Sequence, residues 1–459
     1  MKKPHFLLYF VLLLFFSCNE VEEDADFYIT GRVINSLGQG VEGIKIYYSE
    51  SDYVVTNRSG NWSVFDIYED DIIIAPLDSK YIFSPEKYQL NHLDSSIGKI
   101  FTAKSVEEDK TDQIYNWFVN QQLSNGLLES TENGNIVSLY DNALAALIFM
   151  LYDDFEKAEK IFDFFDSKID SELLQGKGGF SQLRDKNGIP FNRRWMGDNA
   201  WLLIALNNYH SKKGNTKYQR LSDEISNWLK GLQDFDGGLF GGYNSDDTKI
   251  HKITEGNIDA FNAISGYSLF HEKLLDYLGN ERWSSVDKNL VAWIENPKYL
   301  YALDLHSWSY CIFEDYPVSS LHSASRFLNA QIPTISGQEV MGYCFDEDKD
   351  VVWLEGTGHM ALAFKVAGLQ KEAGFYLSEM EKVYVESEKF KNAIGFPYVS
   401  NEGTSYGPEA LWEGASTKPA ISSAAWFLFA KKGFNPFEIE RNKGVPYSKK
   451  FWLHNDEGI

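Results

Sequence analysis

The sequence at residues 139–148 is Leu-Tyr-Asp-Asn-Ala-Leu-Ala-Ala-Leu-Ile, which leaves a helix without a polar face beyond its first turn. A helix that is apolar on all sides is buried on all sides. Runs of the same kind recur at residues 260–264, 361–364 and 421–429. The chain is therefore expected to contain several fully buried helices.

Each predicted buried helix follows a helical segment that carries charge on one face and should lie outside it. Acidic residues near the starts of the inner helices recur at intervals of 45 to 61 residues, a degenerate supersecondary repeat. Six hairpins predict a mainly α protein whose residues 110–440 form an (α/α)6 toroid, followed by a C-terminal tail at 441–459. The predicted pairs are 112–123 with 138–151, 154–169 with 198–210, 218–233 with 258–270, 285–295 with 304–313, 319–328 with 357–366, and 370–385 with 417–431.

Residues 27–104 have a different pattern, in which short β-rich runs alternate with Gly, Asn and Ser turns. This pattern predicts a small β-sandwich. The motifs Gly-Arg-Val at 31–33, Gly-Val-Glu-Gly at 40–43 and Val-Thr-Asn-Arg-Ser-Gly-Asn-Trp at 55–62 resemble the carboxypeptidase regulatory-like family of immunoglobulin-like modules. The resemblance implies a spacer or docking unit without chemistry of its own.

The first residues are typical of an export signal, because Lys2 and Lys3 precede an apolar run at 6–16. The sequence Phe-Phe-Ser-Cys at 15–18 resembles a bacterial lipobox, which implies removal of residues 1–17 and lipidation of Cys18. The acidic tether at 18–26 resembles the export tags of Bacteroidota surface lipoproteins. A lipid-anchored protein at the outer membrane or cell surface is expected, with an ordinary signal peptide or an uncleaved anchor as alternatives.

The composition excludes some partners and favours others. The 459 residues carry a formal net charge of −23, which disfavours binding to nucleic acid. The chain also contains 12 Trp, 26 Tyr and 32 Phe, and aromatic rings offer flat faces on which sugars stack. A carbohydrate substrate is expected, together with other glycan-utilisation proteins as partners. Cys311 and Cys344 lack a Cys-x-x-Cys spacing, so buried thiols are predicted, with a disulfide as the alternative.

A carboxylate precedes or begins every predicted inner helix. Aspartate is a preferred N-cap, so capping is the main role expected for Asp141, Asp198 and Asp304. Glutamate caps poorly, and each of the three glutamates is followed by Gly and then by a better cap, Asn257, Thr357 or Ser416. The Glu-Gly glutamates are therefore predicted to be free for chemistry. They are Glu255, Glu355 and Glu413.

Glycosidic cleavage requires one carboxylic acid to protonate the leaving oxygen and a second carboxylate to activate water or to attack. Glu255 and Glu355 are the first candidates for this pair, with Asp198 and Asp259 as further catalytic candidates. The inner helix starts of a toroid converge on one funnel, which should place these groups around a common cavity. The predicted substrate-binding residues are Trp195, Asp141, Asp304, Trp308, Tyr343, Trp353, Trp412, Glu413 and Arg194.

Three motifs carry a further resemblance. Trp-Met-Gly-Asp-Asn-Ala-Trp at 195–201, Thr-Glu-Gly-Asn-Ile-Asp-Ala at 254–260 and Trp-Leu-Glu-Gly-Thr at 353–357, placed on six hairpins, resemble the six-hairpin glycosidase superfamily. The resemblance implies a glycoside hydrolase without a cofactor. It assigns no acid or base, because no single hydrolase family is matched.

Two other functions remain open from the sequence. A polysaccharide lyase would neutralise a uronate with Arg193 or His251 and abstract a proton through a tyrosine such as Tyr343. A glycan-binding lipoprotein without activity would keep the aromatic residues and would not need the free glutamates.

Other motifs favour structural interpretations. Asp346, Asp348 and Asp350 alternate like calcium ligands, but the loop lacks the glycine and the glutamate of a calcium-binding loop, so a hairpin turn is predicted. His306 and His359 lack metal-ligand spacing, and no metal is expected.

Overall fold

The computed structural model describes residues 28–35, 38, 40–65, 71–91, 96–105, 110–406, 409–410, 412 and 415–454. The predicted signal segment, Cys18, the tether and Glu413 lie outside the described residues. The chain divides into two compact units, Met1–Asp109 and Lys110–Ile459, and each is described by itself. No helix among the described residues is both long and apolar enough to cross a bilayer.

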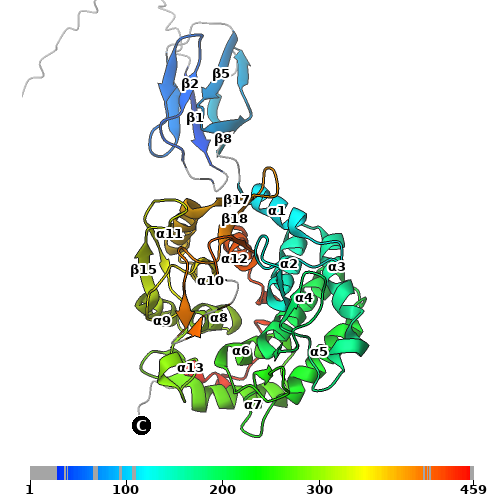
Figure 1. Ribbon diagram of the computed structural model, residues 1–459. Coiled ribbons are helices and arrows are strands. Elements are labelled where there is room, and N and C mark those ends of the chain that lie inside the picture. Colours follow the sequence, from blue (N-terminus) through cyan, green and yellow to red (C-terminus); the bar gives the residue numbers. More distant parts are fainter. Residues whose placement is uncertain are drawn as a thin grey trace, which may run out of the picture. The chain divides into compact units, whose positions relative to one another are not determined.

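The first unit contains two four-stranded sheets that share one apolar core (Figure 1). Burial alternates along the strands, as in β5, where Ile72 and Ile74 are buried and Ile73 is exposed. Gly31 lies against the ring of Trp62, where a Cβ would approach ring atoms to 2.3 Å, so only glycine fits there. The sheets have the orders β4(Asn61–Val64)-β1(Ile29–Ile34)-β8(Ser96–Ser105)-β6(Tyr81–Ser84) and β3(Tyr53–Val55)-β2(Lys45–Tyr47)-β5(Asp71–Leu77)-β7(Tyr88–Asn91).

The second unit is a closed ring of helical hairpins (Figure 1). Six inner helices each pack against the next, and the last packs against the first. The predicted plan of six helical hairpins in a ring is thus confirmed, although one outer helix lies elsewhere than predicted. The inner helices are α2(Leu139–Leu151), α4(Met196–Lys213), α6(Thr254–Ala263), α8(Asp304–Ile312), α10(Leu354–Val366) and α12(Ile421–Lys432), and the outer helices are α1(Lys110–Gln121), α3(Phe155–Asp166), α5(Gln219–Gly231), α7(Leu269–Tyr277), α9(Ser319–Ser323) and α11(Gln370–Met380).

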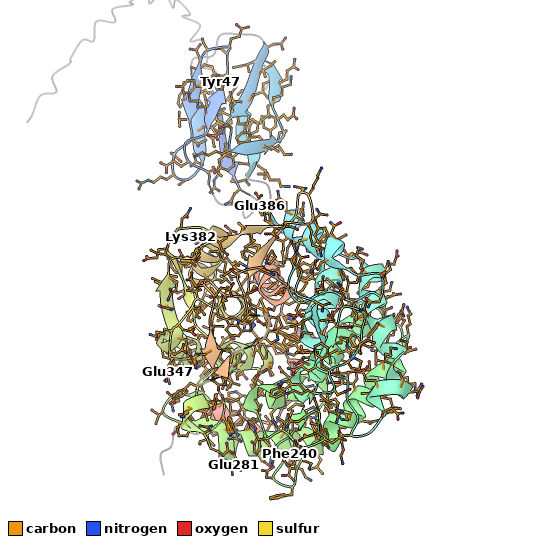
Figure 2. The ribbon with its side chains drawn as sticks, viewed as in Figure 1. Tyr47, Phe240, Glu281, Glu347, Lys382 and Glu386 are labelled. Carbon is orange, nitrogen blue, oxygen red and sulfur yellow. The ribbon has the colours of Figure 1, made fainter. Side chains whose placement is uncertain are left out.

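The inner helices are buried on all sides and the outer helices on one face, as their composition predicts. In α2, every residue from Asp141 to Met150 is buried. In α5, the buried residues include Leu221, Ile225 and Leu229, which recur at the helical period on one face. Charged side chains such as Glu281 and Glu347 lie at the outer edge of the ring (Figure 2).

The fourth outer helix was predicted at the wrong place. The segment 285–295 contains β14(Asn289–Leu290) and loops, and the outer helix is α7. The predicted inner helix 258–270 ends early because Ile264 is extended and Gly266 has a φ of 74°. Ser268 and His271 then form a capping box that starts α7. The last inner helix begins at Ile421 rather than 417, because Pro419–Ala420 forms the strand β21.

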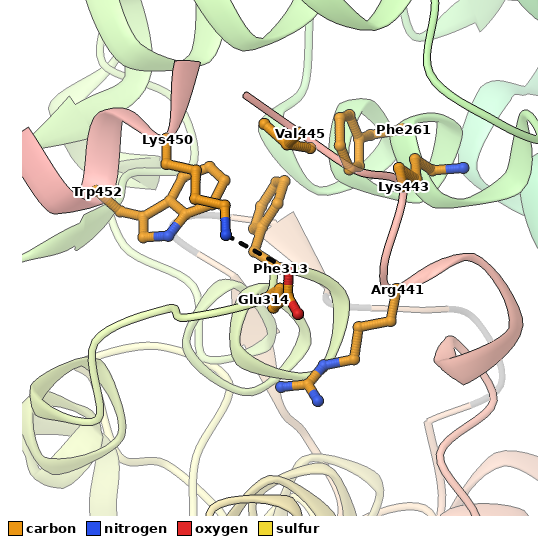
Figure 3. Close-up of a pocket in the computed structure, with 8 residues that line it drawn as sticks. All are labelled: Phe261, Phe313, Glu314, Arg441, Lys443, Val445, Lys450 and Trp452. Carbon is orange, nitrogen blue, oxygen red and sulfur yellow. Dashed lines mark hydrogen bonds and ion pairs between the residues drawn. The ribbon is translucent and has the colours of Figure 1, made fainter. Parts of the chain in front are cut away.

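The segment 435–454, most of it set apart in the sequence as a tail, packs on the helical ring. It closes the end of the ring where the inner helices terminate: Asn208 donates to the carbonyl of Pro436, Asn262 to that of Phe437, and Lys443 to that of Ile264. One cavity beneath this segment has a volume of only about 10 Å³ (Figure 3). A second, open pocket of about 460 Å³ lies at the same end and is lined by α4, by α5 and by Ile439 and Glu440.

Candidate active site

The opposite end of the ring gathers six acidic residues, hereafter the acidic cluster. They stand in the first two turns of five inner helices, and their charges act on one another. The sixth inner helix, α12, starts with Ile-Ser-Ser instead. The acidic cluster consists of Asp141, Asp198, Glu255, Asp259, Asp304 and Glu355.

The acidic cluster is buried rather than open to a funnel, contrary to expectation. Five of its side chains are at most 8% exposed, and only Glu255 is partly exposed. Tyr406 of β19(Ser405–Tyr406) lies close enough for the charges of Asp304 and Glu255 to raise its pKa. Glu255 is therefore the member of the cluster that is most accessible from solvent.

The predicted capping roles of Asp141, Asp198 and Asp304 are wrong. Ser138 caps α2 and accepts from the N–H of Asp141. The cap positions of α4 and α8 are Trp195 and Leu303. The aspartates lie inside the first turn, which leaves Asp141 and Asp198 free of the capping task that the sequence suggested.

The predicted caps Asn257 and Thr357 are also inside their helices, at the fourth position. Asn257 accepts from the N–H of Leu239 and donates to its carbonyl, so it holds a loop against the start of α6. Asn142 and Asn199 make the same pair of bonds to Leu128 and Phe180. The repeated asparagines therefore fasten loops to the inner helices.

The glycines of the Glu-Gly pairs serve packing. A Cβ on Gly356 would lie 2.1 Å from the ring of Trp353, and one on Gly256 would lie 2.8 Å from the methyl carbon of Met196. These glycines allow close approach at the start of the inner helices. The recurrence of Glu-Gly thus has a packing cause as well as a chemical one.

Burial, together with mutual repulsion for all but Asp198, raises the pKa of five members of the acidic cluster, namely Asp141, Asp198, Glu255, Asp259 and Asp304. Burial raises the pKa of Asp198 to about 7 and that of Asp304 to about 7. Burial also raises the pKa of Glu255 well above its usual range, and the charges of Asp304, Asp198 and Glu355 raise it further. Burial and the neighbouring charges therefore both favour the protonated form of Glu255.

Glu355 has a different environment, because two side chains approach its carboxylate. The Tyr140 hydroxyl donates to Oε1 of Glu355 at 2.7 Å and accepts from Nε1 of Trp426 at 2.7 Å. Nε2 of His359, one helical turn onward, lies 3.5 Å from the same oxygen. Burial lowers the pKa of His359, so this imidazole is neutral at pH 7. Glu355 thus acts as a hydrogen-bond acceptor held in one orientation.

Asp259 lies deepest in the acidic cluster. Its side chain is fully buried, and neither carboxylate oxygen makes a well-formed hydrogen bond with the described residues. Burial raises its pKa well above the usual range, and the charge of Glu255 adds to the rise. A Cβ on Gly197 would lie 3.2 Å from Oδ2 of Asp259. Asp259 is therefore shielded from solvent by its neighbours.

The structure places the other predicted binding residues in several environments. Trp308, Tyr343 and Trp353 are at most 4% exposed and pack among other aromatic rings. Arg194 forms an ion pair with Asp247. The half-buried Trp412 packs against Tyr398 at 5.2 Å.

Trp195 is half-buried beneath the guanidinium of Arg193, which lies 4.6 Å from its ring.

Nearby, a row of rings runs toward the acidic cluster, hereafter the aromatic row: His251, Trp293, Tyr299 and Tyr406. Sequence reasoning missed Trp293 and Tyr299. Trp293 lies in the segment 285–295, which was predicted to be a helix, and Tyr299 follows shortly after that segment.

The aspartate-rich loop is fastened internally. Asp346 Oδ1 accepts from the N–H of Asp348, and Asp350 accepts from the N–H of Ser405 at 2.8 Å. The buried thiol of Cys344 donates to Asp350, and both Cys344 and Cys311 are free thiols, as predicted. These bonds account for the alternation of aspartates as turn chemistry.

Comparisons with known proteins show the fold alone. No family model matches the chain, and no curated protein matches it. A D-mannose isomerase structure is 9% identical, with 72% of this chain and 98% of that chain covered and a TM-score of 0.51. A glycosidase in complex with glucose is 12% identical (73% and 99% covered, TM-score 0.49), and the cellobiose 2-epimerase of Bacillus thermoamylovorans B4167 is 10% identical (70% and 96% covered, TM-score 0.49). The chain therefore shares its overall fold with the D-mannose isomerase structure.

Proposed function

We propose that the helical unit is a glycoside hydrolase that acts on an oligosaccharide or polysaccharide. The observation that carries this proposal is the contrast between Glu255 and Glu355 at the same end of the ring. Glu255 is partly exposed and has its pKa raised by burial, whereas Glu355 accepts a short hydrogen bond from Tyr140. Pairs of carboxyl groups held in such different environments divide acid and base roles between them.

Glu255 is the general acid in this proposal. It donates its proton to the leaving glycosidic oxygen as the bond from that oxygen to the anomeric carbon breaks. Glu355 is the partner that takes a proton from water, or that attacks the anomeric carbon itself. In either case water supplies the oxygen and one hydrogen of the new anomeric hydroxyl. The other proton of the water passes through the carboxyl pair and restores Glu255, whose own proton has gone to the leaving alcohol.

The remaining carboxyl groups support this pair. Asp198 and Asp304 act on the charge of Glu255, and Asp259 lies behind it in the same helix. The pKa of Glu255 is raised first by its own burial and then by the charges of Asp304, Asp198 and Glu355. The charge of Asp141 likewise raises the pKa of Tyr140. Tyr140 therefore keeps the hydroxyl proton with which it orients Glu355.

The environment of Tyr343 does not suit the catalytic base of a polysaccharide lyase. Tyr343 is buried, donates its hydroxyl proton to Tyr376 at 2.8 Å, and has its pKa raised far above the usual range by burial. A tyrosine in this environment does not ionise to abstract a proton near neutral pH.

Sugar isomerisation or epimerisation is the second candidate, favoured by the contact between His359 and Glu355. A neutral imidazole beside a carboxylate offers a base for a sugar C–H, and the structural neighbours include a D-mannose isomerase. Deuterium incorporation from heavy water into a reducing sugar would identify this reaction, whereas hydrolysis leaves the sugar carbons unexchanged.

The wider setting belongs to the same proposal. The mature chain begins at Cys18, is anchored in the outer membrane by lipid on that residue, and works beside other glycan-utilisation proteins. The N-terminal unit is a carboxypeptidase regulatory-like module of the immunoglobulin-like type that acts as a spacer. Neither statement assigns chemistry to the first unit.

The test is a product-resolved screen of the mature protein against neutral and acidic glycans. Release of shorter, saturated sugars by the wild-type protein, and loss of that release in both Glu255→Gln and Glu355→Gln, would support hydrolysis. Unsaturated products would instead identify a lyase. Undiminished hydrolysis in either variant would refute the assigned pair.

A further inference from the structure

One cation beside the acidic cluster has no acidic partner. Arg193 is exposed and lies over the ring of Trp195, and within the described part of the chain its guanidinium makes no ion pair. Three neighbouring cations are paired: Arg194 with Asp247, Lys252 with Asp234 and Asp236, and Arg282 with Glu295.

Short strands fix the position of Arg193. The residue precedes β11(Arg194–Trp195), which pairs with β12(Gly242–Tyr243). The adjoining Gly241 donates its N–H to the carbonyl of His251. The charge of Arg193 acts both on Asp198 of the acidic cluster and on His251. Arg193 thus stands between the acidic cluster and the outer end of the aromatic row.

The aromatic row connects the two places. His251 stacks on Trp293 with centroids 3.8 Å apart, and Trp293 stacks on Tyr299 at 5.4 Å. Tyr299 then meets Tyr406 at 4.8 Å, and Tyr406 lies within reach of the charges of Asp304 and Glu255. His251, Trp293 and Tyr299 all retain some exposed surface. A sugar chain lying along this row would extend from Arg193 to Glu255.

An arginine held over an indole ring is pre-organised to receive a planar anion, since its fork of N–H donors matches carboxylate and related oxygens. The surroundings make such a residue necessary for an anionic ligand. A chain with a formal charge of −23, and with six carboxyl groups in the acidic cluster, would otherwise repel that ligand.

We propose that Arg193, together with Trp195, His251, Trp293 and Tyr299, forms a subsite for an anionic sugar unit, carboxylated or sulfated. The inference rests on the proposed function, because the linkage to be cleaved is the one that the bound unit presents to Glu255. A simpler role for Arg193 would be to balance the charge of Asp198. That role predicts equal effects on neutral and anionic sugars, whereas the subsite predicts selective effects.

The experiment measures equilibrium binding by calorimetry in the mature full-length Glu255→Gln protein, which prevents turnover. The probes are a glucuronate-containing oligosaccharide, a sulfated one and a neutral one of equal length, so the two anionic arms distinguish carboxylate from sulfate. Adding Arg193→Gln should weaken binding of the preferred anionic probe roughly 10- to 100-fold and leave neutral binding unchanged. Arg193→Lys should recover part of the loss.

The matched control is Arg220→Gln, which removes an exposed arginine paired with Asp170 on outer elements of the ring. It should leave every affinity unchanged.

Equal losses for neutral and anionic probes, or no preference for an anionic probe before Arg193 is changed, would overturn the subsite. Hydrolysis is measured separately in the wild-type protein. Arg193-dependent anion binding without hydrolysis would therefore refute the proposed function alone, and hydrolysis unaffected by Arg193 would refute the subsite alone.

Discussion

At the scale of single residues, the protonation of the acidic cluster links the site to the stability of the protein. Burial raises the pKa of Asp198 from its usual value near 4 to about 7. A raised pKa means that the folded state binds a proton that the unfolded state has released. The folded state is therefore favoured at low pH, and this contribution is lost as the pH rises from about 4 to 7.

Asp198→Asn should remove this dependence, because asparagine has a similar shape and does not ionise. The stability gained by the variant over the wild-type protein should increase between pH 4 and pH 7 and level off above pH 7, reaching on the order of 4 kcal/mol. Urea unfolding at four pH values measures the difference. A difference that stays constant across this range would show that Asp198 is ionised in the folded protein throughout.

The sequence identified the acidic residues but not their surroundings. Asp141, Asp198 and Asp304 stood out because carboxylates recur at the inner helix starts, and the structure does bring them together. Their capping roles were wrong because Asp141 and Asp198 are the third residues of their helices and Asp304 is the first, so the cap position falls on an earlier residue in each case. The loop-fastening role of Asn199 depends on Phe180, which no local pattern pairs with it.

At the scale of elements, the inner helices were predictable because total apolarity excludes any exposed face. The outer helix α7 was missed because its starting signal, the Ser268 and His271 capping box, lay within a longer segment predicted to be one helix. Residues 285–295 have helical periodicity but are held by β14 and the ion pair of Arg282 with Glu295. Tertiary contacts override local preference in that segment.

The C-terminal segment should contribute strongly to the stability of the ring. Phe437 is fully buried and packs against Trp201, Trp308 and Trp426. Phe437→Ala should therefore lower the free energy of unfolding by about 3–5 kcal/mol, as measured by chemical denaturation. The control in the same segment is Ile439→Ala, which removes a side chain that is 44% exposed and should cost much less. Equal, small effects would show that this segment merely lies on the surface.

At the scale of the whole molecule, each unit has its own apolar core. A fragment that starts near Glu107 should therefore fold alone and retain the activity of the intact protein, as measured by circular dichroism and hydrolysis assays. Full folding with loss of activity would show that the first unit completes the site. A fragment that does not fold would contradict the division into independent units.

Attachment to a membrane is also a property of the whole molecule. If lipid on Cys18 is the anchor, Cys18→Ala should move the protein from the membrane fraction to the soluble fraction after cell lysis, because the lipidated thiol is lost. Cys311→Ala is a suitable control, since that cysteine is buried in the helical ring. Membrane association that persists in Cys18→Ala would refute the lipoprotein assignment.

The division of roles between Glu255 and Glu355 is the central claim, and leaving-group dependence tests it most directly. The rates of both Gln variants are measured on a natural glycoside and on the matching dinitrophenyl glycoside, whose leaving group needs no proton. Glu255→Gln should lose roughly 100- to 10,000-fold on the natural glycoside and far less on the activated one, whereas Glu355→Gln should lose heavily on both. Equal losses on both substrates for Glu255→Gln, or the reverse pattern, would contradict the assignment of Glu255 as the acid.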